Sequence, residues 1–235
     1  MSVFHNNALI GASGGAGVAD AAAGPTKSLR FNSDDEASLS RTPSSAGNRR
    51  TWTWSCWAKR GKLSNENQPF LTVNNGSQSF IMGWHGYYSD GRRDGIEINN
   101  VAGAGDGYVT TGVFRDPSSW YHIVVAFDST LSTSSDRIKI WVNGEAQTFQ
   151  STSNGPTQNQ EWLVNSATAH TIGDSVSSYS WLGQLDSLLA DVQFIDGQAL
   201  APTDFGETRN NGVWQAAAYS GTFGTNGFHL LDFEN

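Results

Sequence analysis

Short runs of alternating apolar and polar residues recur between residues 27 and 205, separated by clusters of Gly, Asn, Ser and Pro. Alternation with a period of two places the apolar side chains on one face of a β-strand. In residues 51–59 this face carries Trp52, Trp54, Cys56 and Ala58. Further strands are expected at residues 28–32, 68–74, 79–84, 95–99, 120–128, 137–142, 168–172 and 188–195. The pattern predicts an all-β sandwich of antiparallel sheets.

Three segments add detail to this sandwich. Residues 120–128 are apolar on both faces, which is typical of a central strand that is covered on both sides. Residues 137–142 run into Asn143-Gly144, the strongest short signal for a hairpin turn. Only residues 201–205, which include Pro202, suggest a helical turn. The sequence therefore predicts a single sandwich with tight turns and almost no helix.

Two segments flank the sandwich of residues 27–205. Residues 1–26 are rich in Gly and Ala and cannot bury enough apolar surface to offset the entropy lost on ordering. We therefore expect an extended arm that a partner surface orders, with Phe4, Leu9, Ile10 and Val18 as its anchoring contacts. Residues 206–235 carry aromatic residues between Gly and Asn, so we expect this tail to pack on the sandwich or on a partner.

Composition and charge narrow the function. The 235 residues include 14 Lys and Arg against 22 Asp and Glu, and the net charge of −8 argues against sequence-independent binding to nucleic acid. No apolar stretch reaches the roughly 18 residues of a membrane span. The single cysteine, Cys56, excludes an intrachain disulfide and is expected to be a buried hydrophobic residue rather than a nucleophile. The first residues lack the pattern of a secretory signal, so we expect synthesis and folding in a reducing cytosol.

The titratable residues give no catalytic pattern. Glycoside hydrolysis needs two carboxyl groups about 5–5.5 Å or about 6.5–9.5 Å apart. Asp186 and Asp191 are separated by an odd number of positions, so a regular strand would point them to opposite faces. Residues 34–36 are acidic and are expected to form a solvated turn. His122 and His170 are expected to be packed in strands, and the histidines do not have metal-ligand spacing, so no catalytic residue and no metal ligand is assigned.

Two loops carry the chemistry of sugar recognition, in which an aromatic face packs on apolar C–H groups and polar side chains bind the hydroxyls. The candidate glycan contacts are Trp84, His85, Tyr87, Tyr88 and Asp90 in one loop, and Tyr179 and Trp181, near Asp174, in the other. The alternative is that Trp84 closes a strand and that the tyrosines cover the rim of the sandwich. The sequence alone leaves both interpretations open.

Residues 120–128 followed by residues 138–145 resemble the paired central strands of laminin-G-like and pentraxin-like jelly rolls, which share the concanavalin-A-like lectin and glucanase sandwich. Residues 29–32, 171–174 and 181–186 resemble other strands of that group. The resemblance implies a two-sheet antiparallel jelly roll over residues 27–205. The glucanases of the group share a Glu-x-Asp-x-x-Glu strand that this sequence lacks. Members often hold calcium in their loops, but the acidic loop residues here are scattered, so no cofactor is predicted and calcium is left open.

Four segments show a narrower resemblance, to lectin-like virion proteins of aquatic tailed bacteriophages. They are residues 41–55, 192–200, 205–207 and 224–228. Those proteins are tail fibres, fibre tips or head decorations, and they often continue past the last of these segments. The resemblance implies a non-enzymatic virion surface protein, a compact decoration or short appendage, assembled in the host cytoplasm. Its expected partners are capsid or tail proteins, copies of itself and host surface glycans. The alternatives are a free carbohydrate-binding lectin and, less favoured, a glycoside hydrolase.

Overall fold

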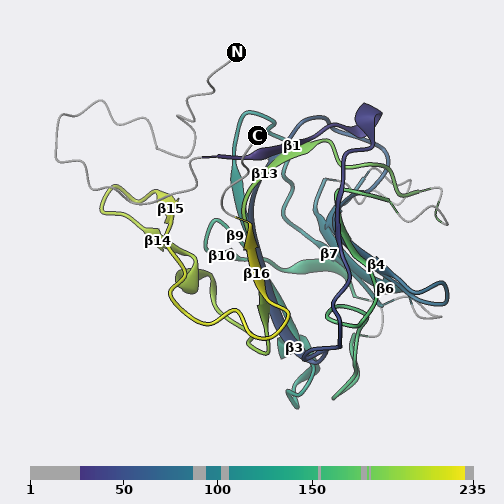
Figure 1. The fold of residues 1–235 in the computed structure, drawn as a ribbon. Helices are drawn as coiled ribbons and strands as arrows, with labels where there is room; N and C mark the ends of the chain where they lie inside the picture. The colour runs from purple at the N-terminus through teal and green to yellow at the C-terminus, as the bar shows by residue number, and fades with distance from the viewer. Residues whose placement is uncertain are drawn as a thin grey trace.

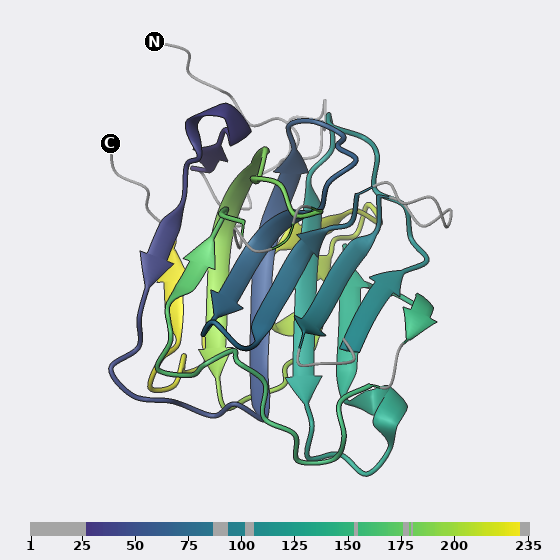
Figure 2. The same ribbon diagram turned by 90° about the vertical axis from the view of Figure 1, so that its right-hand side faces the viewer.

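A computed structural model describes residues 27–86, 94–101, 106–152, 155–175, 179 and 181–230. These residues form two seven-stranded antiparallel sheets that pack face to face (Figures 1 and 2). The architecture confirms the predicted all-β jelly-roll sandwich. Of the described segments, only three short 3₁₀ turns are helical: η1 (Ser33–Asp35), η2 (Ser134–Asp136) and η3 (Pro202–Asp204).

The first sheet, which we call the A sheet, has the strand order β1-β13-β3-β8-β9-β10, and β16 also pairs with β13. Its strands are β1 (Leu29–Phe31), β13 (Ser187–Asp196), β3 (Thr51–Arg60), β8 (Tyr121–Asp128), β9 (Ile138–Val142), β10 (Glu145–Ala146) and β16 (Phe228–Leu230). The second sheet, the B sheet, has the order β11-β7-β6-β5-β4-β12-β2. Its strands are β11 (Phe149–Thr152), β7 (Asp106–Thr110), β6 (Ile96–Val101), β5 (Ser79–Trp84), β4 (Gln68–Asn74), β12 (His170–Ile172) and β2 (Leu39–Arg41).

The core between the sheets is built from the apolar face that the alternation predicts. Trp52, Trp54, Cys56 and Ala58 of β3 are all fully buried. The Trp52 ring stacks on Phe127 of the A sheet with ring centroids 5.2 Å apart and meets Phe80 of the B sheet edge-on at 5.9 Å. Burial of the Cys56 thiol raises its pKa to about 12, so the thiol stays protonated. Cys56 is therefore the buried hydrophobic residue that the sequence predicts.

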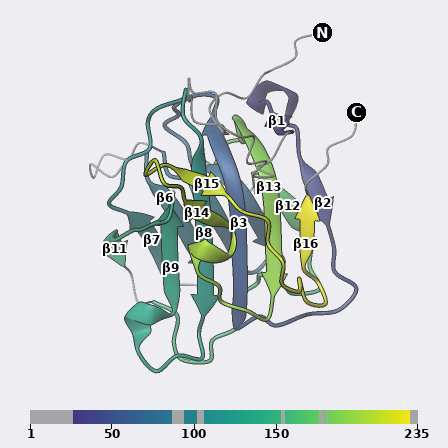
Figure 3. The same ribbon diagram turned by 90° about the vertical axis from the view of Figure 1, so that its left-hand side faces the viewer.

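The outer face of the A sheet is also covered, by the segment that follows β13. This segment includes the two-stranded ribbon of β14 (Gly206–Thr208) and β15 (Trp214–Ala216), which crosses over the sheet (Figure 3). Val124 of β8 is buried in a cluster with Ile195 and Phe205. The apolar character of both faces of β8 is thus explained, and the prediction of a strand covered on both sides is confirmed.

The hairpin predicted at Asn143-Gly144 joins β9 to β10. Both residues have positive φ, 51° and 81°, as a type I′ turn requires. A Cβ atom at position 144 would lie 2.6 Å from ring carbons of Trp214. Glycine at position 144 therefore allows both the positive φ of the turn and the close approach of Trp214 in the covering segment.

A polar cluster with three buried side chains, those of Asn165, Asp196 and Asn226, ties the covering segment to the sandwich. We call Gly47, Asn48, Asn165, Asp196 and Asn226 the Asp196 cluster. The carboxylate of Asp196 accepts hydrogen bonds from Asn48 N–H (2.8 Å), Asn165 Nδ2 (2.6 Å) and Asn226 N–H (3.1 Å). A Cβ atom at position 47 would lie 2.3 Å from Asp196 Oδ2, so glycine is needed there. The cluster joins residues 41–55, 192–200 and 224–228, so each of these three segments has a role in folding.

Candidate functional site

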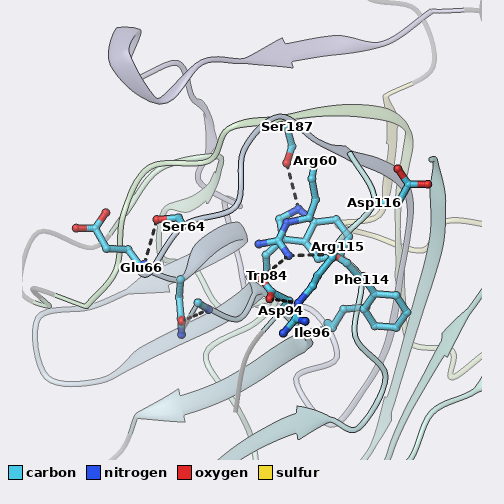
Figure 4. A network of polar contacts seen from close by, with 12 residues as sticks. Arg60, Ser64, Glu66, Trp84, Asp94, Ile96, Phe114, Arg115, Asp116 and Ser187 are labelled. Carbon is cyan, nitrogen blue, oxygen red and sulfur yellow. Dashed lines mark hydrogen bonds and ion pairs between the residues drawn. The ribbon is translucent and has the colours of Figure 1, made fainter. Parts of the chain in front are cut away.

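The first of the two predicted sugar-binding loops does not present Trp84. This side chain lies in β5 with an exposed fraction of 0%, its ring centroid 4.9 Å from that of Phe70, and its Nε1–H donates to Ser187 Oγ at 3.1 Å (Figure 4). A ring enclosed in the core cannot stack on a sugar, so the prediction for Trp84 is wrong and the alternative, that it closes a strand, is correct. His85 is also buried and does not reach the surface. Tyr87, Tyr88 and Asp90 lie outside the described residues, as do Phe4, Leu9, Ile10 and Val18.

A buried ion pair lies next to Trp84. The Arg60 side chain is 0% exposed, and its Nη1 donates to Asp94 Oδ1 at 3.1 Å and to Phe114 O at 3.0 Å (Figure 4). The guanidinium carbon lies 5.0 Å from the centroid of the Trp84 ring, while Nε and Nη2 have no hydrogen-bond partner among the described residues. Burial lowers the pKa of Arg60, and Asp94 opposes this shift. The pair anchors the end of the sandwich and is not accessible to a ligand.

The second predicted loop does reach the surface, on the outer face of the B sheet. Tyr179 and Trp181 are both half-buried, and their ring centroids are 5.1 Å apart. They pack on Ile81 of β5 and on Leu182. The two aromatic residues thus cover part of the sheet and keep part of their rings in contact with solvent.

The register of the B sheet places polar groups on either side of these rings. Thr72, Ile81 and Asn99 lie opposite one another in β4, β5 and β6 and therefore share one face. The Thr72 hydroxyl donates to the backbone oxygen of Asp174 at 3.2 Å, and Gln184 Nε2 donates to the Asp174 carboxylate at 2.8 Å. We call Asn99, Asp174, Tyr179, Trp181 and Gln184 the outer-face site.

Two amide oxygens in this site have spare hydrogen-bonding capacity. Asn99 Nδ2 donates to Glu97 Oε1 at 3.2 Å, and the other carboxylate oxygen of Glu97 accepts from Asn67 Nδ2. Asn99 Oδ1 and Gln184 Oε1 have no partner among the described residues. Both atoms are buried, although the two side chains are partly exposed. Asn99 and Gln184 were not predicted from the sequence; the polar face of residues 95–99 was the only available signal for Asn99.

Comparison with known proteins decides the family. Residues 31–198, more than half of the chain, match the family model Laminin_G_3, described as the concanavalin A-like lectin/glucanases superfamily. The chain belongs to this superfamily. None of the curated proteins matches the chain.

Several solved structures of lectin-like folds are similar to this superfamily member at low identity. A heptameric SAP-like pentraxin from Limulus polyphemus is 14% identical, with a TM-score of 0.47, over 74% of this chain and 76% of the pentraxin. A putative carbohydrate binding protein from Bacteroides ovatus is 14% identical, with a TM-score of 0.47, over 71% of this chain and 42% of that one. The binding domain of botulinum neurotoxin serotype D is 11% identical, with a TM-score of 0.48, over 71% of this chain and 38% of that one.

The superfamily includes glucanases, which need a pair of carboxyl groups, so we describe where the structure places the acidic residues considered above. Asp186 forms an ion pair with Arg30 at 3.0 Å, whereas Asp191 lies 2.5 Å from His229 Nε2. Strand β13 has a register shift between Ala190 and Gln193, so the regular alternation assumed for Asp186 and Asp191 does not hold there. The acidic residues 34–36 are exposed at η1, which confirms the solvated turn.

Within the described ranges, no group of three or more His, Cys, Asp or Glu side chains is arranged to hold a metal ion. Of the helices in the same part of the chain, none has the length and apolar character needed to cross a membrane.

The structure also brings Ser55 and His122 together on the outer face of the A sheet. His122 Nε2 lies 3.0 Å from Ser55 Oγ, and His122 Nδ1 accepts the indole N–H of Trp214 at 2.9 Å. Because the indole can only donate, the neutral imidazole carries its proton on Nε2 and donates to Ser55. His122 therefore cannot take a proton from Ser55, and both residues are fully buried. This pair stabilises the covering segment, and His122 is packed as the sequence predicts.

Acid should destabilise the protein through His122. Burial lowers its pKa from 6.5 to about 4. Between these values the unfolded chain binds a proton that the folded protein excludes, so stability is full above pH 6.5 and falls as the pH decreases. We expect the free energy of unfolding to drop by about 3 kcal/mol between pH 7 and pH 4 from this residue.

Urea denaturation at a series of pH values measures this effect. Burial also lowers the pKa of His170, which adds to the total slope with the same sign. The contribution of His122 is therefore the difference between the wild-type curve and that of His122→Gln, which should have lower stability at pH 7 and a shallower slope. Parallel curves for the two proteins would contradict the assignment.

Proposed function

We propose that the chain is a non-enzymatic carbohydrate-binding protein whose ligand contacts the outer-face site. The observation that carries the proposal is the half-buried pair of rings, Tyr179 and Trp181, on the same face of the B sheet as the half-buried polar side chains of Asn99 and Gln184. A sugar supplies apolar C–H groups for the rings and hydroxyl groups for the polar side chains beside them. Membership of a superfamily that contains lectins supports the same reading.

Replacing Trp181 by alanine should weaken glycan binding by about fivefold or more, because a ring contact contributes about 1 kcal/mol or more. Tyr179→Ala should have a similar effect. The measurement is titration calorimetry with the best ligand from an array of bacterial surface polysaccharides, together with the melting temperature of each variant.

Tyr219→Ala is the matched control, because Tyr219 is a half-buried aromatic residue that packs against the Phe205 cluster on the opposite sheet. This variant should lose stability and keep glycan binding. Equal losses of binding in Tyr219→Ala and Trp181→Ala would show that the effect is general destabilisation. Release of reducing ends from a bound polysaccharide would contradict the non-enzymatic part of the proposal.

We further propose that this domain is displayed on a bacteriophage virion, as a head decoration, fibre or short tail appendage, and that it serves host attachment. The supporting observations are the Gly- and Ala-rich composition of residues 1–26 and the resemblance of the four segments named above to virion proteins. Deletion of residues 2–26 should abolish incorporation into particles and leave the melting temperature of the sandwich unchanged. Normal incorporation of the deleted protein would overturn this second proposal without affecting the first.

A further inference from the structure

A cavity of about 280 Å³ opens at the side of the sandwich, between the edge strand β2 of the B sheet and β16 at the edge of the A sheet. Figures 2 and 3 both show these strands next to each other. The cavity is separate from the outer-face site. It is lined by Leu39, Ser40, Arg41, Pro43, Leu71, Asn165, His170, Ile172, Phe194, Asn226, Phe228 and Leu230. We propose that it binds a free medium-chain carboxylate, with the alkyl chain inside and the carboxylate at Arg41.

The apolar character of the cavity follows from the gap between two sheet edges. Leu71, Ile172 and Phe194 belong to the buried core and form the inner wall. Phe228 and Leu230 of β16 are half-buried, and Leu39 of β2 is 36% exposed at the mouth. Apolar groups left open to water in this way favour an alkyl chain over a sugar.

The volume of the cavity sets the length of the alkyl chain that it can hold. A cavity of about 150 Å³ holds one benzene ring, and sites for drug-sized ligands begin at about 300 Å³. A water molecule takes about 30 Å³ in the liquid, and a methylene group takes a similar volume, so the cavity holds about eight carbon atoms. Octanoate is therefore the probe of choice.

The charges at the mouth favour an anion. Arg41 is exposed, and its side chain is held at the mouth because Nη1 donates to Asn226 O at 2.8 Å and the guanidinium carbon lies 5.8 Å from the Phe228 ring centroid. His170 is neutral, because Nε2 accepts from Asn165 N–H at 2.8 Å and Nδ1 bonds to Thr168 O at 2.7 Å. The described lining contains no Asp or Glu. Arg41 is thus the one fixed charge among these lining residues.

Titration calorimetry of the full chain with hexanoate, octanoate and octanol tests the proposal. Affinity should rise about fourfold for each methylene added from hexanoate to octanoate. Arg41→Gln should weaken octanoate by about tenfold, because a hydrogen bond to a charged group is lost, and should change octanol binding by less than about twofold.

A blocking variant and a matched control complete the experiment. Leu39→Trp adds volume at an exposed position at the mouth and should abolish binding of both octanoate and octanol, while glycan binding is retained. Leu63→Trp, at a leucine that is 51% exposed and outside the lining, should leave both affinities unchanged. No octanoate binding at millimolar concentration, or unchanged binding in Leu39→Trp, would overturn the proposal. Binding only to a variant that ends at Leu230 would also overturn it, since residues 231–235 would then be the occupant.

Discussion

Replacing Asp196 by alanine should lower the free energy of unfolding by about 4 kcal/mol, because three donors, two of them buried, lose their acceptor at once. These donors are the backbone N–H groups of Asn48 and Asn226 and the side-chain amide of Asn165. Each of them lies in a different segment, and the Asn165 amide keeps a second acceptor, Asn48 O at 3.0 Å. Urea denaturation measures the loss.

Limited proteolysis adds a readout for the covering segment, which the Asp196 cluster ties to the sandwich. Asp196→Ala should be cut faster within residues 206–230 than the wild type. Asp204→Ala is the control, because this exposed carboxylate bonds only to the nearby Ala201 N–H at 3.1 Å and should cost about 1 kcal/mol or less. Similar losses in the two variants would contradict the role assigned to the Asp196 cluster.

Asp94→Ala should cost about 3–5 kcal/mol, because it leaves the buried guanidinium of Arg60 without its counter-ion. Adding Arg60→Met to this variant should restore much of the lost stability, since methionine buries no charge. The double variant should therefore unfold at a higher urea concentration than Asp94→Ala alone.

Arg115→Ala removes the exposed partner of Asp94 and leaves the buried partner, Arg60, in place. Arg115 Nε lies 2.6 Å from Asp94 Oδ2, but its side chain is 48% exposed, so its loss should cost about 1 kcal/mol or less. A double variant no more stable than Asp94→Ala, or an equally large loss in Arg115→Ala, would contradict the account of the buried pair.

The sequence predicts the central strands well because their pattern has a single physical cause. Residues 51–59 alternate because one face of this strand builds the core, and Asn143-Gly144 is specified by the positive φ values of its turn. Seven short strands were not predicted: β2, β7, β10, β11, β14, β15 and β16. Strands of two to five residues are too short to show a clear period, and their place depends on the neighbouring strands that they pair with.

The candidate site was predicted only in part, for a related reason. Loop composition alone cannot tell which side of a strand end a ring occupies, and Trp84 proved to lie between the sheets. Tyr179 and Trp181 were identified by residue type, but Asn99 reaches them only through the register of β5 and β6. Gln184 belongs to the site because its side chain bonds to Asp174, a contact that depends on how the loop folds and that the sequence does not show.

The two outer faces of the sandwich differ in a way that fits the proposed function. The outer face of the A sheet is sealed by residues of the covering segment such as Phe205 and Ala216. The outer face of the B sheet keeps Tyr179 and Trp181 half-exposed. A ligand surface is therefore expected on the B sheet, while the A sheet serves the stability of the domain.

The most direct test of this account is an amide NMR titration of the protein with an oligosaccharide identified on the array. Carbohydrate binding at the outer-face site predicts chemical-shift changes at Asn99, Asp174, Tyr179, Trp181 and Gln184, with little change at Trp214 and Ala216. Changes confined to the A-sheet face, or no change with any bacterial surface glycan, would contradict the account.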